Sequence, residues 1–265
     1  MEHGVSDVWA SGAAYEPYVG RWSRLVAREF LNWLAVPARG RWLDVGCGTG
    51  GLTETILAIA SPDSVTGVDP SEAYVAFARA HIRDARASFE VGSAMALAAQ
   101  TATFEAAVAG LVLNFVPQAE TAVMEMARVT KPGGVVAAYV WDYAEGMGLM
   151  RRFWDAAVAL ETSATALDEG KRFPLCRPEP LTRLFNGTGL HDVQVRAIDI
   201  PTGFRDFDDY WLPFLGGQGP APGYVMSLTE ERRATLRERI RASLTTELDG
   251  SIHLTARAWA VRGMR

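Results

Sequence analysis

Residues 43–51 read LDVGCGTGG, and this glycine-rich loop constrains the fold more than any other stretch of the chain. An apolar run ending at Val45 leads into the loop, and apolar residues at helical spacing follow it. Glycines at a strand-to-helix turn permit positive backbone angles and let a ligand approach the main chain. The loop fits two spacings at once, because it reads G-x-G-x-x-G from Gly46 and D-x-G-x-G-x-G from Asp44. Both spacings are typical of a cofactor-binding turn.

Strand-like and helix-like segments alternate on both sides of this loop. The apolar patterns predict strands at 42–45, 65–68, 88–91, 104–113 and 135–140. Helices are predicted at 52–59, 71–82 and 119–130. Such alternation predicts an α/β fold with a doubly wound, mostly parallel sheet covered by helices on both faces. Ligands of such sheets bind at the carboxyl ends of the strands.

The regular alternation of strand-like and helix-like segments ends after Asp142. We expect a helix at 147–161, a proline- and charge-rich loop at 171–180, a short helix around 181–185 and a strand at 191–200. Ser227 and Glu230 form a capping-box pattern for a helix that continues to Leu244. A final strand is predicted at 252–261. A chain of 265 residues is expected to form one domain with insertions.

Charge and composition exclude several classes of partner. The net charge is −5 without a basic tract, which disfavours nucleic acid, and the five arginines between 232 and 241 alternate with glutamates as on a solvated helix face. We expect no membrane segment, because no run of ~18 apolar residues occurs. Two cysteines, Cys47 and Cys176, suit a reducing compartment, so a cytoplasmic location is expected.

Asp44 separates the two interpretations of the glycine loop. A carboxylate at this point would repel the pyrophosphate of a dinucleotide. It would attract a ligand with an ammonium or sulfonium group, and S-adenosylmethionine carries both. Asp69, about twenty residues on, can accept hydrogen bonds from ribose hydroxyls in either case. We therefore predict S-adenosylmethionine as the cofactor, with S-adenosylhomocysteine as its product, and no metal.

The chain resembles the class I S-adenosylmethionine-dependent methyltransferases, in the small-molecule branch of the ubiquinone and menaquinone enzymes. The motifs that carry the resemblance are LDVGCGTG, VTGVDPSEAYVAFARA, EVGSAMAL, FEAAVAGLVLNFVP and MARVTKPGGVVAAYVWD. The resemblance implies a Rossmann-like seven-stranded sheet with an antiparallel last strand and helical lid insertions. Within one methyltransferase domain at 1–265, it implies a cap helix at 15–36, a cofactor-binding core at 41–142, lids at 143–180 and 204–249, and a final strand at 250–263.

The resemblance also assigns cofactor contacts. It implies that Asp44 orients the cofactor ammonium and that the turn beneath the methionine moiety is shaped by Gly46, Gly48 and Gly50. Asp69 would hold the ribose, with Pro70 beside the adenine.

Two further parts of the chain are candidates for cofactor contacts. Ser93, followed by Ala94, replaces the usual aspartate at the adenine and offers an uncharged hydroxyl. The stretch YEPYVGRWS resembles the N-terminal cap helix that closes over the methionine end of the cofactor in such enzymes. Its candidate contacts are Tyr15, Tyr18 and Arg21. The alternative role of the two tyrosines is packing beneath the cap.

Candidates for the acceptor site follow the fourth and fifth strands. Asn114 either binds the acceptor or ties a loop, and Trp141 and Tyr143 either line the pocket or cap the core. Trp211 is the candidate from the second lid, at 204–249. The four histidines are scattered, so no general base stands out. We expect in-line methyl transfer to a small or medium-sized, largely apolar metabolite. The alternatives are a non-catalytic S-adenosylmethionine-binding module and, less well supported, an NAD-dependent oxidoreductase.

Overall fold

A sheet of seven strands forms the centre of the protein in the computed structural model, which describes residues 16–217 and 219–265. The strand order is β3-β2-β1-β4-β5-β7-β6, and β7 is antiparallel to both of its neighbours. The strands are β1 (Arg41–Val45), β2 (Ser64–Asp69), β3 (Ala87–Val91), β4 (Phe104–Gly110), β5 (Thr130–Trp141), β6 (His191–Phe204) and β7 (Ile252–Met264). This arrangement confirms the predicted fold class.

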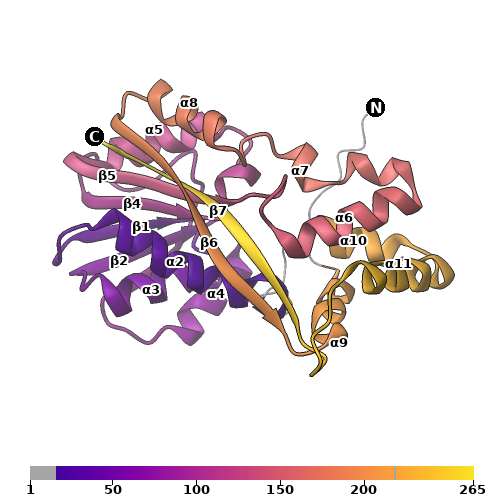
Figure 1. Ribbon diagram of the computed structural model, residues 1–265. Coiled ribbons are helices and arrows are strands. Elements are labelled where there is room, and N and C mark those ends of the chain that lie inside the picture. The colour runs from indigo at the N-terminus through magenta and orange to yellow at the C-terminus, as the bar shows by residue number, and fades with distance from the viewer. Residues whose placement is uncertain (1–15, 218) are drawn as a thin grey trace.

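Helices cover both faces of the sheet (Figure 1). One face carries α2 (Arg21–Leu34), α3 (Gly51–Ile59) and α4 (Glu72–His81), and the other carries α5 (Ala119–Val129) and α8 (Pro178–Gly187). A π-helical turn, η1 (Glu16–Gly20), precedes α2. The helix α2 packs because Trp22, Val26 and Phe30 recur at intervals of four and are buried. Together, η1 and α2 occupy most of the segment at 15–36 that was predicted as the cap.

The fourth strand is shorter than predicted. β4 ends at Gly110, and Leu111 takes a positive φ of 61°, which breaks the extended backbone. The chain then forms a 3₁₀ turn, η2 (Leu113–Phe115). The apolar run to Leu113 suggested a longer strand, because a buried turn and a buried strand have the same composition. The early stop places Asn114 and Phe115 on a turn at the carboxyl edge.

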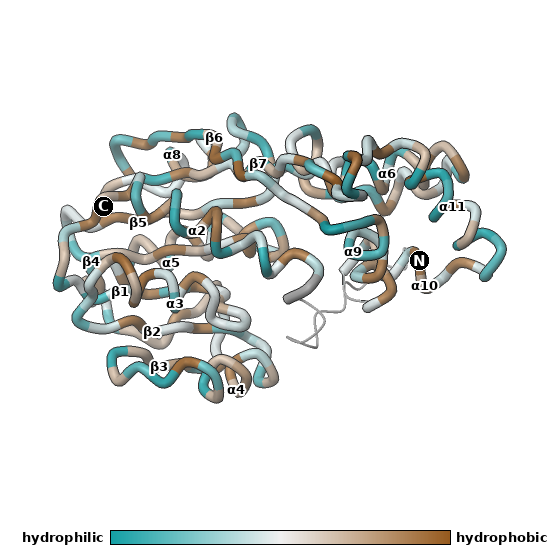
Figure 2. Tube along the Cα trace, turned by 60° about the horizontal axis from the view of Figure 1, so that its bottom comes forward, coloured by the Kyte–Doolittle hydropathy of each residue, from teal (hydrophilic) through white to brown (hydrophobic). Residues whose placement is uncertain are grey.

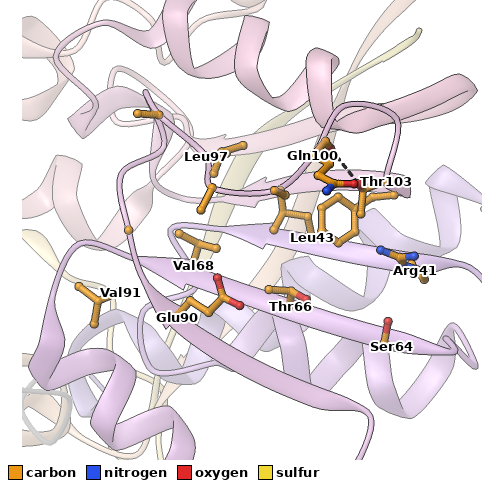
Figure 3. Close-up of a pocket in the computed structure, with 15 residues that line it drawn as sticks. Arg41, Leu43, Ser64, Thr66, Val68, Glu90, Val91, Leu97, Gln100 and Thr103 are labelled. Carbon is orange, nitrogen blue, oxygen red and sulfur yellow. Dashed lines mark hydrogen bonds between the residues drawn. The ribbon is translucent and has the colours of Figure 1, made fainter.

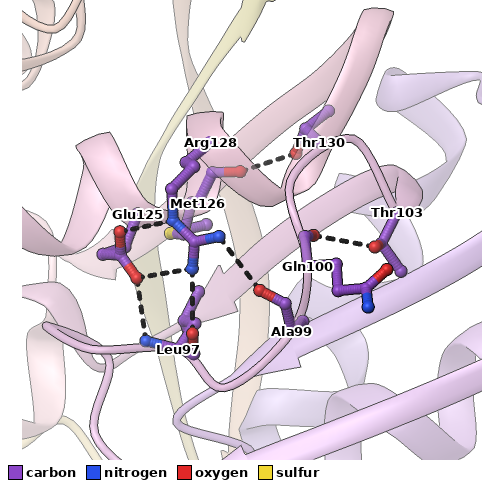
Figure 4. Close-up of polar contacts among 8 residues, drawn as sticks. All are labelled: Leu97, Ala99, Gln100, Thr103, Glu125, Met126, Arg128 and Thr130. Atoms are coloured by element: carbon purple, nitrogen blue, oxygen red, sulfur yellow. Dashed lines mark hydrogen bonds and ion pairs between the residues drawn. The ribbon is translucent and has the colours of Figure 1, made fainter.

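Residues 92–103 connect β3 to β4 as a loop without a helix, so the helical layer on this face of the sheet is incomplete. The Arg128 guanidinium on α5 donates to the carbonyl oxygens of Leu97 and Ala99 at 2.8 and 3.0 Å (Figure 4). It also pairs with Glu125, whose carboxylate accepts the Leu97 N–H at 2.9 Å. Arg128 thus provides hydrogen-bond donors for backbone carbonyl oxygens of a loop that has few backbone hydrogen bonds to neighbouring strands.

The two excursions form a helical lid beyond one end of the sheet (Figure 2). Its elements are α6 (Gly148–Leu160), η3 (Thr162–Ala166), α7 (Glu169–Arg172), α9 (Phe207–Trp211), η4 (Leu212–Gly216), α10 (Pro220–Ser227) and α11 (Glu230–Ser243). The expected loop at 171–180 is therefore partly helical, since α7 ends within it and Pro178 begins α8.

The last helix differs from its prediction at its start. Thr229, not Ser227, caps α11, and its hydroxyl accepts the Arg232 N–H at 3.4 Å. Ser227 instead ends α10 and donates to a carbonyl oxygen one turn earlier. Only Leu236 and Ile240 of α11 are buried, so this helix is the solvated one that the alternating charges indicated.

Candidate functional site

The glycine loop uses one of its two possible spacings. Gly46, Gly48 and Gly50 have positive φ angles of 71°, 53° and 90°, whereas a Cβ on Gly51, the first residue of α3, would meet no atom closer than 3.6 Å. A Cβ on Gly46 would lie 2.5 Å from a Val112 methyl group, but one on Gly48 would meet nothing within 4 Å. The turn therefore follows the D-x-G-x-G-x-G pattern, and Gly48 borders open space.

Asp69, at the end of β2, stabilises the glycine loop by hydrogen bonds to its backbone. Its carboxylate accepts the Gly48 N–H at 3.0 Å and the Ser71 N–H at 2.9 Å. The Gly46 N–H adds a bond of 2.7 Å to the Val68 carbonyl oxygen. Two carboxylate oxygens offer about four acceptor positions, so Asp69 can still accept from a ligand. Its role includes shaping the turn, which the sequence analysis did not foresee.

A cavity of about 280 Å³ lies above the loop at the carboxyl edge of the strands. It is bordered by the glycine loop, the start of α4 and the segments that follow β2 and β4. Its lining includes predicted residues and others that the sequence analysis did not select: Ser23, Asp44, Gly46, Gly48, Asp69, Pro70, Tyr74, Leu111, Phe115 and Tyr139. The lining thus joins the ends of several strands with the cap helix.

Asp44 brings a nearly buried carboxylate to this cavity. It is 1% exposed; Oδ2 accepts the Thr53 hydroxyl at 2.6 Å, and Oδ1 has no hydrogen-bond partner within the described part of the chain. Burial raises the pKa of Asp44 to about 7, and the Thr53 hydrogen bonds oppose that rise. A buried acceptor without a donor is costly. An ammonium group of a bound ligand would satisfy it and favour the ionised carboxylate.

Tyr74 supplies a second unpaired polar group in the cavity. Its hydroxyl is buried and has no hydrogen-bond partner among the described residues. Burial and the Asp69 charge raise the pKa of Tyr74 to about 12, so the phenol remains a donor at neutral pH. The sequence analysis predicted a helix at 71–82 but did not select Tyr74 as a site residue. Its position three residues after the capping Ser71 was the signal that this first turn faces the site.

The other predicted cofactor residues lie around the cavity or outside the description. Tyr15 falls outside the described residues. Tyr18 is buried and donates to the Met150 sulfur at 3.0 Å. The Arg21 guanidinium pairs with Asp209 of α9 at 3.0 Å and lies over the Trp22 and Phe204 rings, so it joins the cap to the lid.

The predicted adenine segment is not part of the cavity lining. The Ser93 hydroxyl accepts the Met95 N–H at 3.2 Å, which makes a local turn, and Ala94 is half-buried beside it. Both residues begin the loop that Arg128 holds. Their contact with adenine stays a prediction.

The predicted acceptor residues differ in their surroundings. Asn114 is half-buried, and its Nδ2 has no hydrogen-bond acceptor in the part of the chain that the structure describes. Trp141 and Trp211 are 2% and 3% exposed within the core. Tyr143, at 8%, contacts the Phe173 ring at 5.9 Å between centroids. Of these four, Asn114 has the clearest unmet hydrogen-bonding capacity.

A second hollow, of about 660 Å³, lies on the open face of β1, β2 and β3 beneath the 92–103 loop (Figure 3). Arg41 and Ser64 begin their strands there, and Thr66 and Glu90 also face it. None of the predicted site residues is among its lining. It lies where a helix between β3 and β4 would otherwise cover the strands.

Fold and site together define a class of protein: a doubly wound α/β domain with a glycine turn and a buried carboxylate suited to a cationic cofactor. A family model described as "Methyltransferase domain" matches residues 43–134. The demethylmenaquinone methyltransferase of Roseiflexus is 31% identical over 181 residues, which are 63% of this chain and 74% of that protein. The chain belongs to the class I S-adenosylmethionine-dependent methyltransferases, in the branch of the quinone methyltransferases.

Two other similarities agree with this assignment. The 2-methyl-6-phytyl-1,4-hydroquinone methyltransferase of Synechocystis is 29% identical over 195 residues, which are 71% of this chain. The chain spans only 60% of the length of that relative. The crystal structure of the YcgJ protein from Bacillus subtilis has a TM-score of 0.60 at 17% identity and covers 91% of this chain and 98% of its own. It supports the fold alone.

Residues 16–217 and 219–265 contain neither a candidate membrane-spanning helix nor a candidate metal site. None of their helices is long and apolar enough to pass through a bilayer. No group of three or more histidine, cysteine, aspartate or glutamate side chains is arranged there to bind a metal ion.

Proposed function

We propose that this protein transfers a methyl group from S-adenosylmethionine to a small or medium-sized, largely apolar metabolite. The observation that carries the proposal is the unpartnered Oδ1 of Asp44 at the cavity beside Gly48. Asp44 would hold the cofactor ammonium, Asp69 the ribose hydroxyls and Pro70 one side of the adenine. When bound, S-adenosylmethionine supplies an electrophilic methyl group on a sulfonium, and its leaving group departs uncharged.

The residues of the chain would align the reactants and exclude water. Asn114 and Phe115 follow β4, and Tyr143 follows β5, so all three lie at the carboxyl edge where the acceptor would approach the methyl group. Alignment of two bound reactants can contribute about 7–11 kcal/mol to lowering a barrier. The lid helices bury many aromatic side chains, which favours an enclosed acceptor over an open nucleic-acid groove. The two free cysteines favour a cytoplasmic site of action.

Calorimetric titration tests the cofactor, and label transfer tests the reaction. We expect binding of S-adenosylmethionine and S-adenosylhomocysteine and no binding of NAD. Labelled methyl groups should enter the small-molecule fraction of a cell extract. Binding of NAD alone would overturn the cofactor proposal. Cofactor binding without any label transfer would indicate the non-catalytic module, and label chiefly in RNA, DNA or protein would contradict the proposed acceptor class.

A further inference from the structure

Leu111, directly after β4, has a backbone angle that leucine rarely adopts. Its φ is 61°, in the left-handed region that favours glycine, asparagine and aspartate. Six non-glycine residues of the described chain have a positive φ, and Leu111 is the one of these six that lines the cofactor cavity. The other five lie on loops that lead into strands or at the start of a strand: Ala35, Arg39, Ser61, Ala102 and Asp192. An unfavourable backbone angle at the edge where ligands bind is an observation that points to function.

Contacts with β5 hold the chain at this angle. The Leu111 N–H donates to the Tyr139 carbonyl oxygen at 2.7 Å, so the chain stays paired with β5 up to this residue. At the preceding Gly110, an added Cβ would lie 2.6 Å from the Tyr139 hydroxyl oxygen, which shows how closely this side chain approaches the backbone. The surrounding structure therefore determines the angle, as an unfavourable backbone conformation requires.

The residues that follow Leu111 form one wall of the cofactor cavity. Val112 lies over the glycine turn, because a Cβ on Gly46 would meet three of its side-chain atoms at 2.5, 2.8 and 2.9 Å. Phe115 follows on η2, and its N–H donates to the Val112 carbonyl oxygen at 2.9 Å. Leu111, Val112 and Phe115 all line the cavity. The direction that the chain takes at Leu111 thus places the other two residues of this wall.

The same wall reaches the lid. The Phe115 ring contacts the ring of Phe173, which follows α7, at 5.0 Å between centroids in an edge-to-face arrangement. Both phenylalanines are half-buried. The segment 111–115 therefore touches the glycine turn through Val112 and the lid through Phe115. A misplacement of about 1 Å can lower the rate of an aligned reaction roughly 100-fold, so the position of such a segment matters for transfer.

We propose that Leu111 is a positioning residue for methyl transfer, because its left-handed backbone holds the segment 111–115 against the glycine turn and the lid. The inference rests on the proposed methyltransferase function. Leu111 acts through Val112 and Phe115, and its own side chain adds apolar surface to the cavity. A β-branched residue resists a positive φ more strongly than leucine does, because its second γ atom crowds the backbone. Substitution can therefore separate the backbone angle from the side chain.

The variants Leu111→Ile and Leu111→Met make this separation. Isoleucine is an isomer of leucine that branches at Cβ, whereas methionine has a similar volume and no branch there. The matched control is Leu184→Ile, which makes the same change at a half-buried leucine within α8. The two measurements are calorimetric titration with S-adenosylmethionine and label transfer from saturating S-adenosylmethionine into a small-molecule cell extract.

Leu111→Ile should weaken S-adenosylmethionine binding about tenfold and lower the transfer rate at saturating cofactor roughly 10- to 100-fold. Leu111→Met and Leu184→Ile should stay within about threefold of the wild type in both measurements. If Leu111→Ile equals Leu111→Met in binding and rate, the proposal is overturned, even if urea unfolding shows that the isoleucine variant is less stable. A wild type that binds the cofactor but transfers no label would overturn the proposed function, and the comparison of binding would still test the cavity wall.

Leu111→Gly provides a second measurement that does not depend on the isoleucine variant folding. Glycine adopts a positive φ without steric cost, whereas Leu111→Ala removes the same contacts but keeps the Cβ that opposes this angle. The glycine variant should therefore bind S-adenosylmethionine more tightly and transfer label faster than the alanine variant, by about threefold. A glycine variant that is no better than the alanine variant would show that the backbone angle does not position the wall, and it would contradict the proposal.

Discussion

At the scale of single residues, Asp44 carries a cost in stability, and we propose that cofactor binding offsets it. Its carboxylate is buried, and Oδ1 lacks a partner, so ionisation without a ligand is unfavourable. A group whose pKa is raised on folding contributes stability that is fully present below its unfolded pKa, near 3.8, and lost as the pH rises to about 7. The cofactor-free protein therefore carries this penalty at neutral pH, and we expect a bound cationic cofactor to relieve it.

Cofactor affinity should depend on the ionisation of Asp44. Below pH 7 the carboxyl is increasingly protonated, so S-adenosylmethionine binding should weaken by up to roughly tenfold per pH unit. Asp44→Asn should remove this dependence and weaken binding about 10- to 100-fold at pH 8, because a charge-assisted hydrogen bond is lost. Calorimetry from pH 5.5 to 8.5, in roughly one-unit steps, measures both effects. The exposed Asp63→Asn serves as a control, and a pH-independent wild type would remove Asp44 from the ammonium site.

Tyr74→Phe tests the residue that the sequence analysis did not select. Removing a hydroxyl that bonds the cofactor should weaken S-adenosylmethionine binding about 3- to 15-fold, equivalent to roughly 0.6–1.6 kcal/mol. Without cofactor the variant should be at least as stable as the wild type, because the buried hydroxyl has no partner among the described residues. Calorimetry and urea unfolding give the two values. Unchanged affinity would show that the hydroxyl does not face the ligand.

At the scale of elements, local patterns predicted the strands and most helices because each carries its own periodicity. The glycine turn and Asp69 were predictable for the same reason, since their spacing is fixed by adjacent elements. The 92–103 loop and the early end of β4 were not predictable in this way. The loop depends on contacts between residues far apart in the sequence, such as that of Arg128 with Leu97.

Arg128→Met should loosen the loop between β3 and β4. The variant leaves the Leu97 and Ala99 carbonyl oxygens without their donor and Glu125 without its cation. We expect a loss of about 1–3 kcal/mol in the free energy of unfolding, measured in urea. The control is Arg83→Met, at an exposed position beyond α4. A loss in Arg128→Met no larger than in the control would show that the loop does not depend on this side chain.

At the scale of the whole molecule, the cap and the lid are joined by polar contacts as well as packed rings. The Arg21 guanidinium of α2 lies 4.5 Å from the Trp22 ring centroid and 4.9 Å from that of Phe204, and it pairs with Asp209 at 3.0 Å. Asp209 also accepts the Arg205 N–H at 3.0 Å. Because the Asp209 side chain is only 15% exposed, this pair is less screened by solvent than a surface ion pair.

Asp209→Asn should therefore weaken the closed arrangement of cap and lid. The neutral amide leaves the partly buried Arg21 charge without its counter-ion, and Asp208→Asn, which affects an exposed pair with Arg237, is the matched control. We expect Asp209→Asn to raise the KM for the acceptor several-fold and to speed tryptic cleavage within the lid, with little change in the Kd of S-adenosylmethionine. The cofactor cavity is lined by the glycine loop and strand ends, and α9 contributes nothing to the lining. If the two variants have equal effects on the acceptor KM and on proteolysis, the Arg21–Asp209 pair does not hold the lid. If Asp209→Asn loses cofactor affinity, Arg21 of the cap belongs to the cofactor site itself.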